Sequence, residues 1–85
     1  NWNKKMFNEF KKMKIETNRS YGNFLLVNFN KVKIKSSRVF KLLAKAGILV
    51  RKMDVYGINN SLRITVGKSI ENRKLISKMK TILNV

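Results

Sequence analysis

One arginine in a short apolar segment is the side chain of this sequence whose position first suggests anion binding. Arg63 lies in LRITVG at 62–67, where branched apolar residues alternate with Arg63 and Thr65. In a β-strand this alternation places Arg63 and Thr65 on one face and the apolar side chains on the other. This face therefore meets either water or an anion, and a guanidinium there would offer two parallel donors to a carboxylate or a phosphate.

Other kinds of site chemistry are nearly absent from the sequence. There is no cysteine, which excludes disulfides and thiolate metal sites, and no histidine, the commonest general base and metal ligand. The four acidic residues are dispersed and do not suggest a paired-carboxylate site, and there is no glycine-rich phosphate loop. We therefore assign no catalytic, cofactor-binding or metal-binding residue to this chain and do not expect a self-contained hydrolase.

The formal net charge of +16 points first toward nucleic acid or an anionic membrane surface. Lysine supplies most of the 20 basic residues, and asparagine and isoleucine are also abundant, a bias that an AT-rich genome produces as well. We interpret the densest basic stretches, at residues 4–14 and 31–35, as solvated surface, because charge alone specifies neither fold nor function. A functional basic patch, and with it a small basic nucleic-acid-binding α+β module, is the alternative.

The length of 85 residues suits one domain with a thin hydrophobic core. Apolar runs are only a few residues long, and no leader-like segment stands at the N-terminus. We therefore expect a soluble cytoplasmic chain with no membrane partner and no specific nucleic-acid partner.

Hydrophobic periodicity predicts an α+β fold. Helices are predicted at 3–13, 36–46 and 69–83, and strands at 21–29, 48–53 and 62–66. Ser36 or Ser37 is expected to cap the second helix, and Gly47 to end it in a left-handed conformation. These elements predict a small, mainly antiparallel sheet covered by helices on one face.

The aromatic residues are assigned to the core. Exposed aromatics that stack on bases are the exception, so burial is the simpler interpretation of their apolar-face positions. The residues concerned are Phe7, Phe10, Phe24, Phe29 and Phe40, and Trp2 is expected to pack at the start of the first helix.

Four short motifs follow one another in the order and spacing of a known domain. They are Asn23-Phe24-Leu25, Gly47 to Arg51, Leu62 to Gly67, and Glu71-Asn72. Together they resemble the C-terminal small domain of histidinol-phosphate aminotransferases, which are pyridoxal-phosphate enzymes of the aspartate-aminotransferase fold. The resemblance implies that residues 1–85 are such a small domain and that the large cofactor-binding domain is absent from this chain.

Three residues depart from the family pattern. The family commonly has Thr-Pro after the glycine of the third motif, where this chain has Lys68 and Ser69. Ser69 is expected to take over the cap of the last helix. Many relatives carry arginine where Asn28 stands, so no role is carried over to that residue.

The resemblance implies a substrate-clamping role within a complete enzyme. That enzyme would transfer the amino group between histidinol phosphate and 2-oxoglutarate or glutamate in histidine biosynthesis, as a homodimer with pyridoxal phosphate. The chain alone is expected to bind no cofactor and to be inactive. Relatives that decarboxylate threonine phosphate share the same pattern, so the substrate stays open among phosphate-bearing compounds.

The resemblance also implies roles for individual residues. Arg63 would grip the anionic end of the substrate, the phosphate in one half-reaction and the carboxylate of glutamate in the other. Arg51 would be a second phosphate contact, and Asn23 and Tyr56 would border the site. Without the resemblance, solvated strand arginines, a satisfied strand end at Asn23 and loop packing at Tyr56 are the simpler interpretations.

Overall fold

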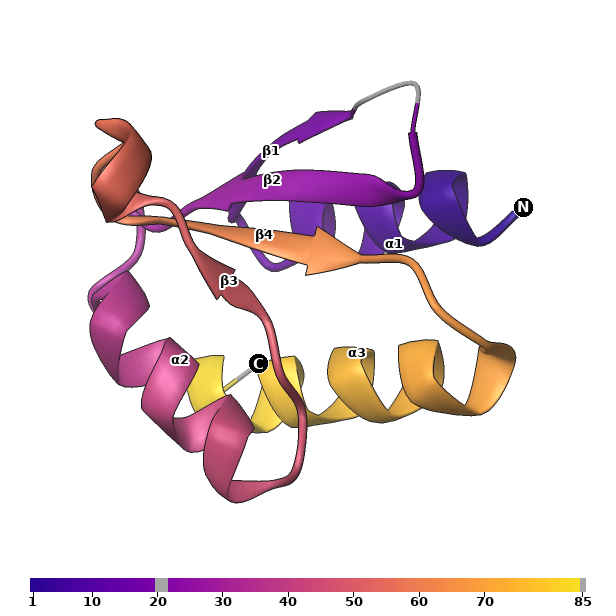
Figure 1. The fold of residues 1–85 in the computed structure, drawn as a ribbon. Helices are drawn as coiled ribbons and strands as arrows, with labels where there is room; N and C mark the ends of the chain where they lie inside the picture. Colours follow the sequence, from indigo (N-terminus) through magenta and orange to yellow (C-terminus); the bar gives the residue numbers. More distant parts are fainter. Residues whose placement is uncertain (20–21, 85) are drawn as a thin grey trace.

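The structure is a computed structural model that describes residues 1–19 and 22–84. These residues form an antiparallel sheet and three α-helices (Figure 1). The helices are α1 (Trp2–Lys12), α2 (Ser36–Lys45) and α3 (Ser69–Leu83), and the strands are β1 (Glu16–Arg19), β2 (Phe24–Asn28), β3 (Arg51–Lys52) and β4 (Ser61–Thr65). A short 3-10 helix, η1 (Asp54–Tyr56), lies between β3 and β4. The predicted α+β class is confirmed, and the predicted start of a strand at residue 21 lies outside the described residues.

The sheet has the strand order β1-β2-β4-β3, with every neighbouring pair antiparallel. All three helices lie on one side of it, and the opposite face carries no helix among the described residues (Figure 1). Alternate residues of β2 and β4 therefore point into the helical layer, where Leu25, Val27, Leu62 and Ile64 are fully buried. The remaining buried apolar residues are Met6, Phe10, Met13, Ile15, Phe29, Val39, Leu43, Leu75 and Met79.

One aromatic residue is not where the sequence analysis placed it. Phe10 and Phe29 are buried, and Phe7 and Phe40 are half-buried against the core, as predicted. Phe24 is different, because it lies one residue away from Leu25 on a strand and so faces the side of the sheet without helices. Apolar residues occupy both faces of β2, and alternation alone did not show which face the helices cover.

The predicted strand at 48–53 is wrong in extent, because only Arg51 and Lys52 pair with β4. The preceding residues Ile48 and Val50 pack against the core without joining the ladder, while the side chain of Leu49 between them is 82% exposed. Alternate residues can therefore be buried without strand pairing, so the alternating pattern predicted a longer strand than the structure contains.

The C-terminal end of α2 agrees with the prediction. Gly47 has φ of +80°, a conformation that costs a residue with a side chain roughly 1–2 kcal/mol. The N–H of Gly47 donates to the carbonyl of Ala44, and the N–H of Ile48 donates to the carbonyl of Leu43. These two bonds form a Schellman motif, which satisfies the last carbonyls of the helix.

The start of α2 is satisfied differently from the prediction. Ser36 is already the first helical residue, and the side chain of Lys35, at the N-cap position, makes no capping hydrogen bond. The backbone N–H of Ser36 donates instead to Oδ1 of Asn60, at 2.8 Å, from a residue 24 positions away. The side chain of Asn60 therefore does the capping that was assigned to Ser36 or Ser37.

The start of α3 also differs from the prediction. Its N-cap position is Lys68, so Ser69 lies inside the helix and is not the cap. The carboxylate of Glu71 accepts a hydrogen bond from the N–H of Lys68 at 2.8 Å. The hydroxyl of Ser69 instead accepts a hydrogen bond from Nε1 of Trp2, at 2.9 Å, which ties the start of α1 to the start of α3.

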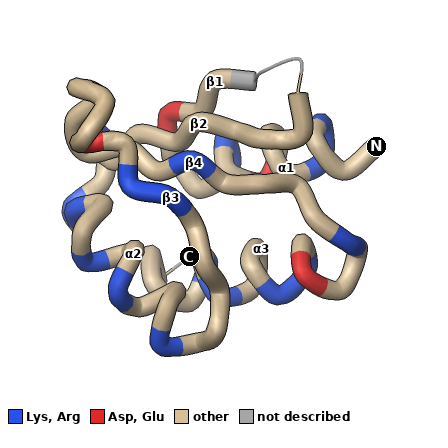
Figure 2. The backbone as a smooth tube through the Cα atoms, in the orientation of Figure 1, with Lys and Arg blue, Asp and Glu red and all other residues tan. Residues whose placement is uncertain are grey.

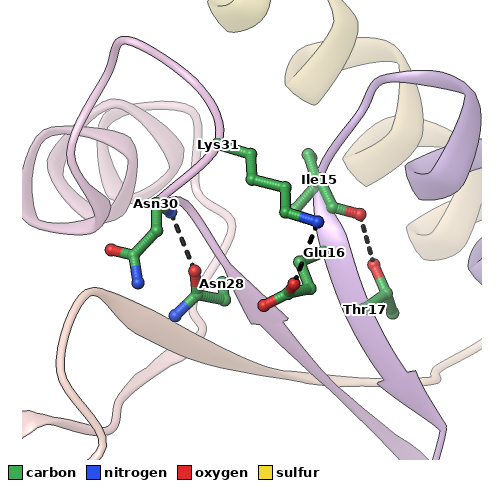
Figure 3. Close-up of polar contacts among 6 residues, drawn as sticks. All are labelled: Ile15, Glu16, Thr17, Asn28, Asn30 and Lys31. Atoms are coloured by element: carbon green, nitrogen blue, oxygen red, sulfur yellow. Dashed lines mark hydrogen bonds and ion pairs between the residues drawn. The ribbon is translucent and has the colours of Figure 1, made fainter.

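Polar contacts link the loop before α2 to the end of β2 and to the start of β1 (Figure 3). The backbone N–H of Asn30 donates to Oδ1 of Asn28 at 2.8 Å, and Nδ2 of Asn28 donates to Oγ of Ser61 at 3.0 Å. Nζ of Lys31 lies 3.3 Å from Oε2 of Glu16. Asn28 thus has a structural role in closing the end of the sheet.

The basic residues are spread over the molecule. Figure 2 shows lysines and arginines along all three helices, on β3 and on β4. Among the described residues there are three ion pairs, in which Lys12 and Lys80 contact Glu9 and Lys31 contacts Glu16. This dispersion does not single out one groove for a polyanion. None of the helices described combines the length and the apolar character needed to cross a membrane.

Candidate anion-binding site

Arg51 and Arg63 lie directly opposite each other on the strands β3 and β4. Arg63 pairs with Leu26 of β2 on one side and with Arg51 on the other. Residues in such register have Cβ atoms about 4.5–5.5 Å apart and share a face of the sheet. The structure therefore brings together the two arginines that the sequence singled out, on the face that has no helix.

Packing fixes the guanidinium of Arg63. Its Cζ lies 4.1 Å from the centre of the ring of Phe24, two residues along the face on the adjacent strand. Arg63 is half-buried, and its Nε is buried with no hydrogen-bond partner among the residues that the structure describes. An unsatisfied buried donor costs about 1–3 kcal/mol, whereas a cation over an aromatic face gains about 0.5–2 kcal/mol. Phe24 thus orients the guanidinium of Arg63 on this face of the sheet.

No carboxylate in the described part of the chain forms an ion pair with Arg51 or Arg63. Like charges directly opposite each other on neighbouring strands are destabilising. Glu9 and Glu16 form ion pairs with lysines elsewhere, and the carboxylates of Asp54 and Glu71 accept hydrogen bonds from backbone N–H groups. The described residues leave two like charges side by side, which is the arrangement expected where an anion completes the site.

A surface hollow of about 270 Å³ lies beside the two arginines. Its lining consists of Leu49, Val50, Arg51, Arg63 and Thr65. The hollow exists because residues 48–50 do not continue the ladder of β3 along β4. An anion in this hollow would have access to both guanidinium groups.

The structure does not bring Asn23 and Tyr56 into this hollow. Asn23 precedes β2, is exposed, and its carbonyl accepts a hydrogen bond from the N–H of Val66 at 2.6 Å. Tyr56 is 60% exposed in η1. Neither residue lines the hollow, and their assignment to the border of a site stays a prediction.

One polar residue that supports the site was not found by sequence reasoning. Asn72 of α3 is 1% exposed. The N–H of Gly67 donates a hydrogen bond to Oδ1 of Asn72 at 2.8 Å, and Nδ2 of Asn72 donates to the carbonyl of Gly67 at 2.9 Å. It therefore fixes the turn that follows β4, the strand carrying Arg63. The only signal in the sequence was the Glu71-Asn72 dipeptide in the family resemblance.

Comparisons with known proteins identify the origin of this fold. No family model matches the chain. The chain is 40% identical over 81 residues to the histidinol-phosphate aminotransferase of Pelagibacter ubique, and 38% identical over 79 residues to that of Campylobacter jejuni. The chain belongs, as a segment, to the histidinol-phosphate aminotransferase family. The first match covers 94% of this chain but 22% of the relative, so the chain spans about a fifth of the length of a histidinol-phosphate aminotransferase.

Solved structures agree with the fold expected for a segment of a histidinol-phosphate aminotransferase. Aspartate aminotransferase from Thermus thermophilus matches with a TM-score of 0.81 at 13% identity, over 96% of this chain and 23% of that protein. A decarboxylase from Sulfurospirillum multivorans matches with a TM-score of 0.70 at 25% identity, over 94% of this chain and 25% of that protein. The first likeness shows the aminotransferase fold alone.

Histidinol-phosphate aminotransferases are pyridoxal-phosphate enzymes, and the described residues do not fit that cofactor by themselves. The cofactor needs a lysine for a Schiff base and an acidic partner for its pyridine nitrogen. Every lysine of this segment is exposed except Lys78, which is half-buried, and the single aspartate, Asp54, is exposed and bonded to the N–H of Asn60. Among the described residues there is thus a candidate anion site, but no enclosed lysine of the kind that a Schiff base with this cofactor needs.

Proposed function

We propose that residues 1–85 are the C-terminal small domain of a pyridoxal-phosphate-dependent aminotransferase and that this domain grips the anionic end of the substrate. In the complete enzyme, Arg63 and Arg51 would bind the phosphate of histidinol phosphate. Arg63 would bind a carboxylate of glutamate or 2-oxoglutarate in the other half-reaction. The observation that carries this proposal is the cross-strand pair of arginines, with which no carboxylate of residues 1–19 and 22–84 forms an ion pair.

The contribution of this domain is positioning. A guanidinium fork held by Phe24 fixes both the location and the orientation of the bound anion. The reacting end of the substrate is then presented to the large domain, whose cofactor supplies the amino-transfer chemistry. A substrate that carries phosphate at one end and an amine at the other suits this division of roles between the two domains. We further propose that the complete enzyme is a cytoplasmic homodimer, as the family resemblance implies.

The 85-residue chain by itself is expected neither to hold pyridoxal phosphate as a Schiff base nor to transaminate histidinol phosphate. None of its lysines is enclosed in a pocket that would exclude water from an adduct. The check is borohydride reduction of the chain incubated with the cofactor, followed by peptide mapping, together with an assay of turnover. A single lysine modified in high yield, with turnover, would contradict the proposal.

The proposal is tested by Arg51→Gln in the complete enzyme. The substitution removes one charge-assisted contact to the phosphate, so kcat/KM for histidinol phosphate is expected to fall at least about 10-fold. The half-reaction with glutamate should change less, because Arg63 binds that carboxylate. The readout is single-turnover kinetics that follow the cofactor absorbance with each substrate. Arg38→Gln is the matched control, since Arg38 is exposed on α2. Equal rates for wild type and Arg51→Gln would remove Arg51 from the site.

A further inference from the structure

The hydroxyl of Thr65 differs from the other threonine hydroxyls of the chain. Oγ1 of Thr17 donates to the carbonyl of Ile15 at 3.1 Å (Figure 3), and Oγ1 of Thr81 donates to the carbonyl of Ser77 at 3.2 Å. Thr65 is exposed, and its hydroxyl has no hydrogen-bond partner among residues 1–19 and 22–84. It is therefore the threonine hydroxyl that is available to a ligand.

The position of Thr65 relates this free hydroxyl to the arginine pair. Thr65 follows Arg63 by two residues on β4, so both side chains point to the same face, roughly 6–7 Å apart along the strand. Both residues line the hollow of about 270 Å³ that also contains Arg51. The side chains of all three residues can thus reach one bound group.

The short length of β3 is what keeps Thr65 accessible. Arg51 pairs with Arg63, so continued pairing would place Leu49 opposite Thr65. The ladder stops at Arg51, and the side chain of Leu49 is 82% exposed. The edge of β4 beside Thr65 consequently opens into the hollow, where a continuous strand would have covered it.

We propose that Thr65 is a specificity-determining residue, whose hydroxyl donates a hydrogen bond to a phosphate group held by Arg63 and Arg51. This inference rests on the function proposed above and adds a selection between the two anions that the site must accept. The two oxygens of a carboxylate lie in one plane, and the fork of one guanidinium engages both. A phosphate monoester has a third terminal oxygen outside that plane, and this oxygen is the acceptor for the hydroxyl of Thr65.

The experiment compares Thr65→Val with Thr65→Ser in the complete enzyme. Valine keeps the branched shape and the strand preference but removes the donor, whereas serine keeps the donor. For Thr65→Val, kcat/KM with histidinol phosphate should fall about 10-fold or more through KM, and the glutamate half-reaction should stay within about twofold. Thr65→Ser should restore most of the loss. Inorganic phosphate should inhibit Thr65→Val more weakly than wild type, and acetate should inhibit both equally.

Thr17→Val is the matched control, because the hydroxyl of Thr17 is bonded within the chain and lies outside the hollow. Thr65→Ala serves as a second donor-free variant in case Thr65→Val does not fold. Unchanged histidinol phosphate kinetics, or equal losses with both substrates, would overturn the assignment of Thr65. If Arg63→Lys lowers both half-reactions while Thr65→Val changes neither, the assignment of Thr65 alone fails. If Arg63→Lys changes neither half-reaction, the proposed function fails.

Discussion

Replacing Arg63 with lysine in the complete enzyme is expected to lower kcat/KM by about 10- to 150-fold for histidinol phosphate and for glutamate alike. Lysine keeps the positive charge but presents no planar fork, so the bidentate contact to a phosphate or a carboxylate is lost. Lysine also lacks the planar group that lies 4.1 Å from the ring centre of Phe24, so the remaining charge is less well oriented. Because one residue serves both half-reactions, the loss should appear with both substrates.

The stability of the Arg63→Lys enzyme should change little. Arg63 lies on the face of β4 opposite to the fully buried Leu62 and Ile64, so the core is not altered. Single-turnover kinetics with each substrate and a thermal melt are the measurements, with Arg38→Lys as the control at an exposed helical position. Unchanged rates would make Arg63 an ordinary surface residue, and a large drop in melting temperature would make it a structural one.

The second large effect is expected for Asn72→Leu, which should lower the free energy of unfolding of the chain by about 1–3 kcal/mol. Leucine has a similar size, but it cannot replace the two hydrogen bonds to the N–H and the carbonyl of Gly67, which are 2.8 and 2.9 Å long. Urea denaturation can be followed by the fluorescence of Trp2, which is bonded to Ser69 near that turn.

Asn8→Leu is the control for Asn72→Leu, because Asn8 is exposed on α1 and its substitution should stay within about 0.5 kcal/mol of wild type. An equal effect of the two substitutions would mean that the amide of Asn72 is not what holds the turn. A stabilised Asn72→Leu chain would show that apolar packing at this position outweighs the hydrogen bonds.

The helices and the main strands could be predicted from the sequence because their apolar residues recur at the periods of the two structures. In β4, for example, Leu62 and Ile64 are buried while Arg63 is on the other face, as the alternation predicted. The extent of the strand predicted at 48–53 could not be predicted in the same way. Burial of Ile48 and Val50 repeats every second residue whether or not the backbone pairs with a neighbour.

The N-terminal caps of α2 and α3 were missed because the side chains that accept the backbone hydrogen bonds there, those of Asn60 and Glu71, are not the serines at which the helices begin. The cap of α2 comes from Asn60, which occupies a left-handed conformation with φ of 54° in the loop before β4. Sequence patterns favour a serine as the N-cap residue, and Ser36 was assigned that role. Ser36 is instead the first residue of the helix, so its backbone N–H needs an acceptor. Such contacts follow from the tertiary fold, which brings that loop to the start of α2.

The candidate site could be predicted in part. Alternation placed Arg63 on the side away from the core, and the family resemblance added Arg51. That the two guanidinium groups lie opposite each other depends on the register of β3 against β4, which the sequence does not specify. The same is true of Phe24, whose contact with Arg63 depends on the register of β2 against β4.

The measurement that tests the anion clamp most directly compares histidinol phosphate with histidinol, which lacks the phosphate, in wild type and in Arg63→Lys. If Arg63 binds the phosphate, the substitution should cost about 10- to 150-fold in kcat/KM with histidinol phosphate and no more than about twofold with histidinol. The same loss with both compounds would show that Arg63 acts on something other than the phosphate, and would contradict the proposed role of the arginine pair.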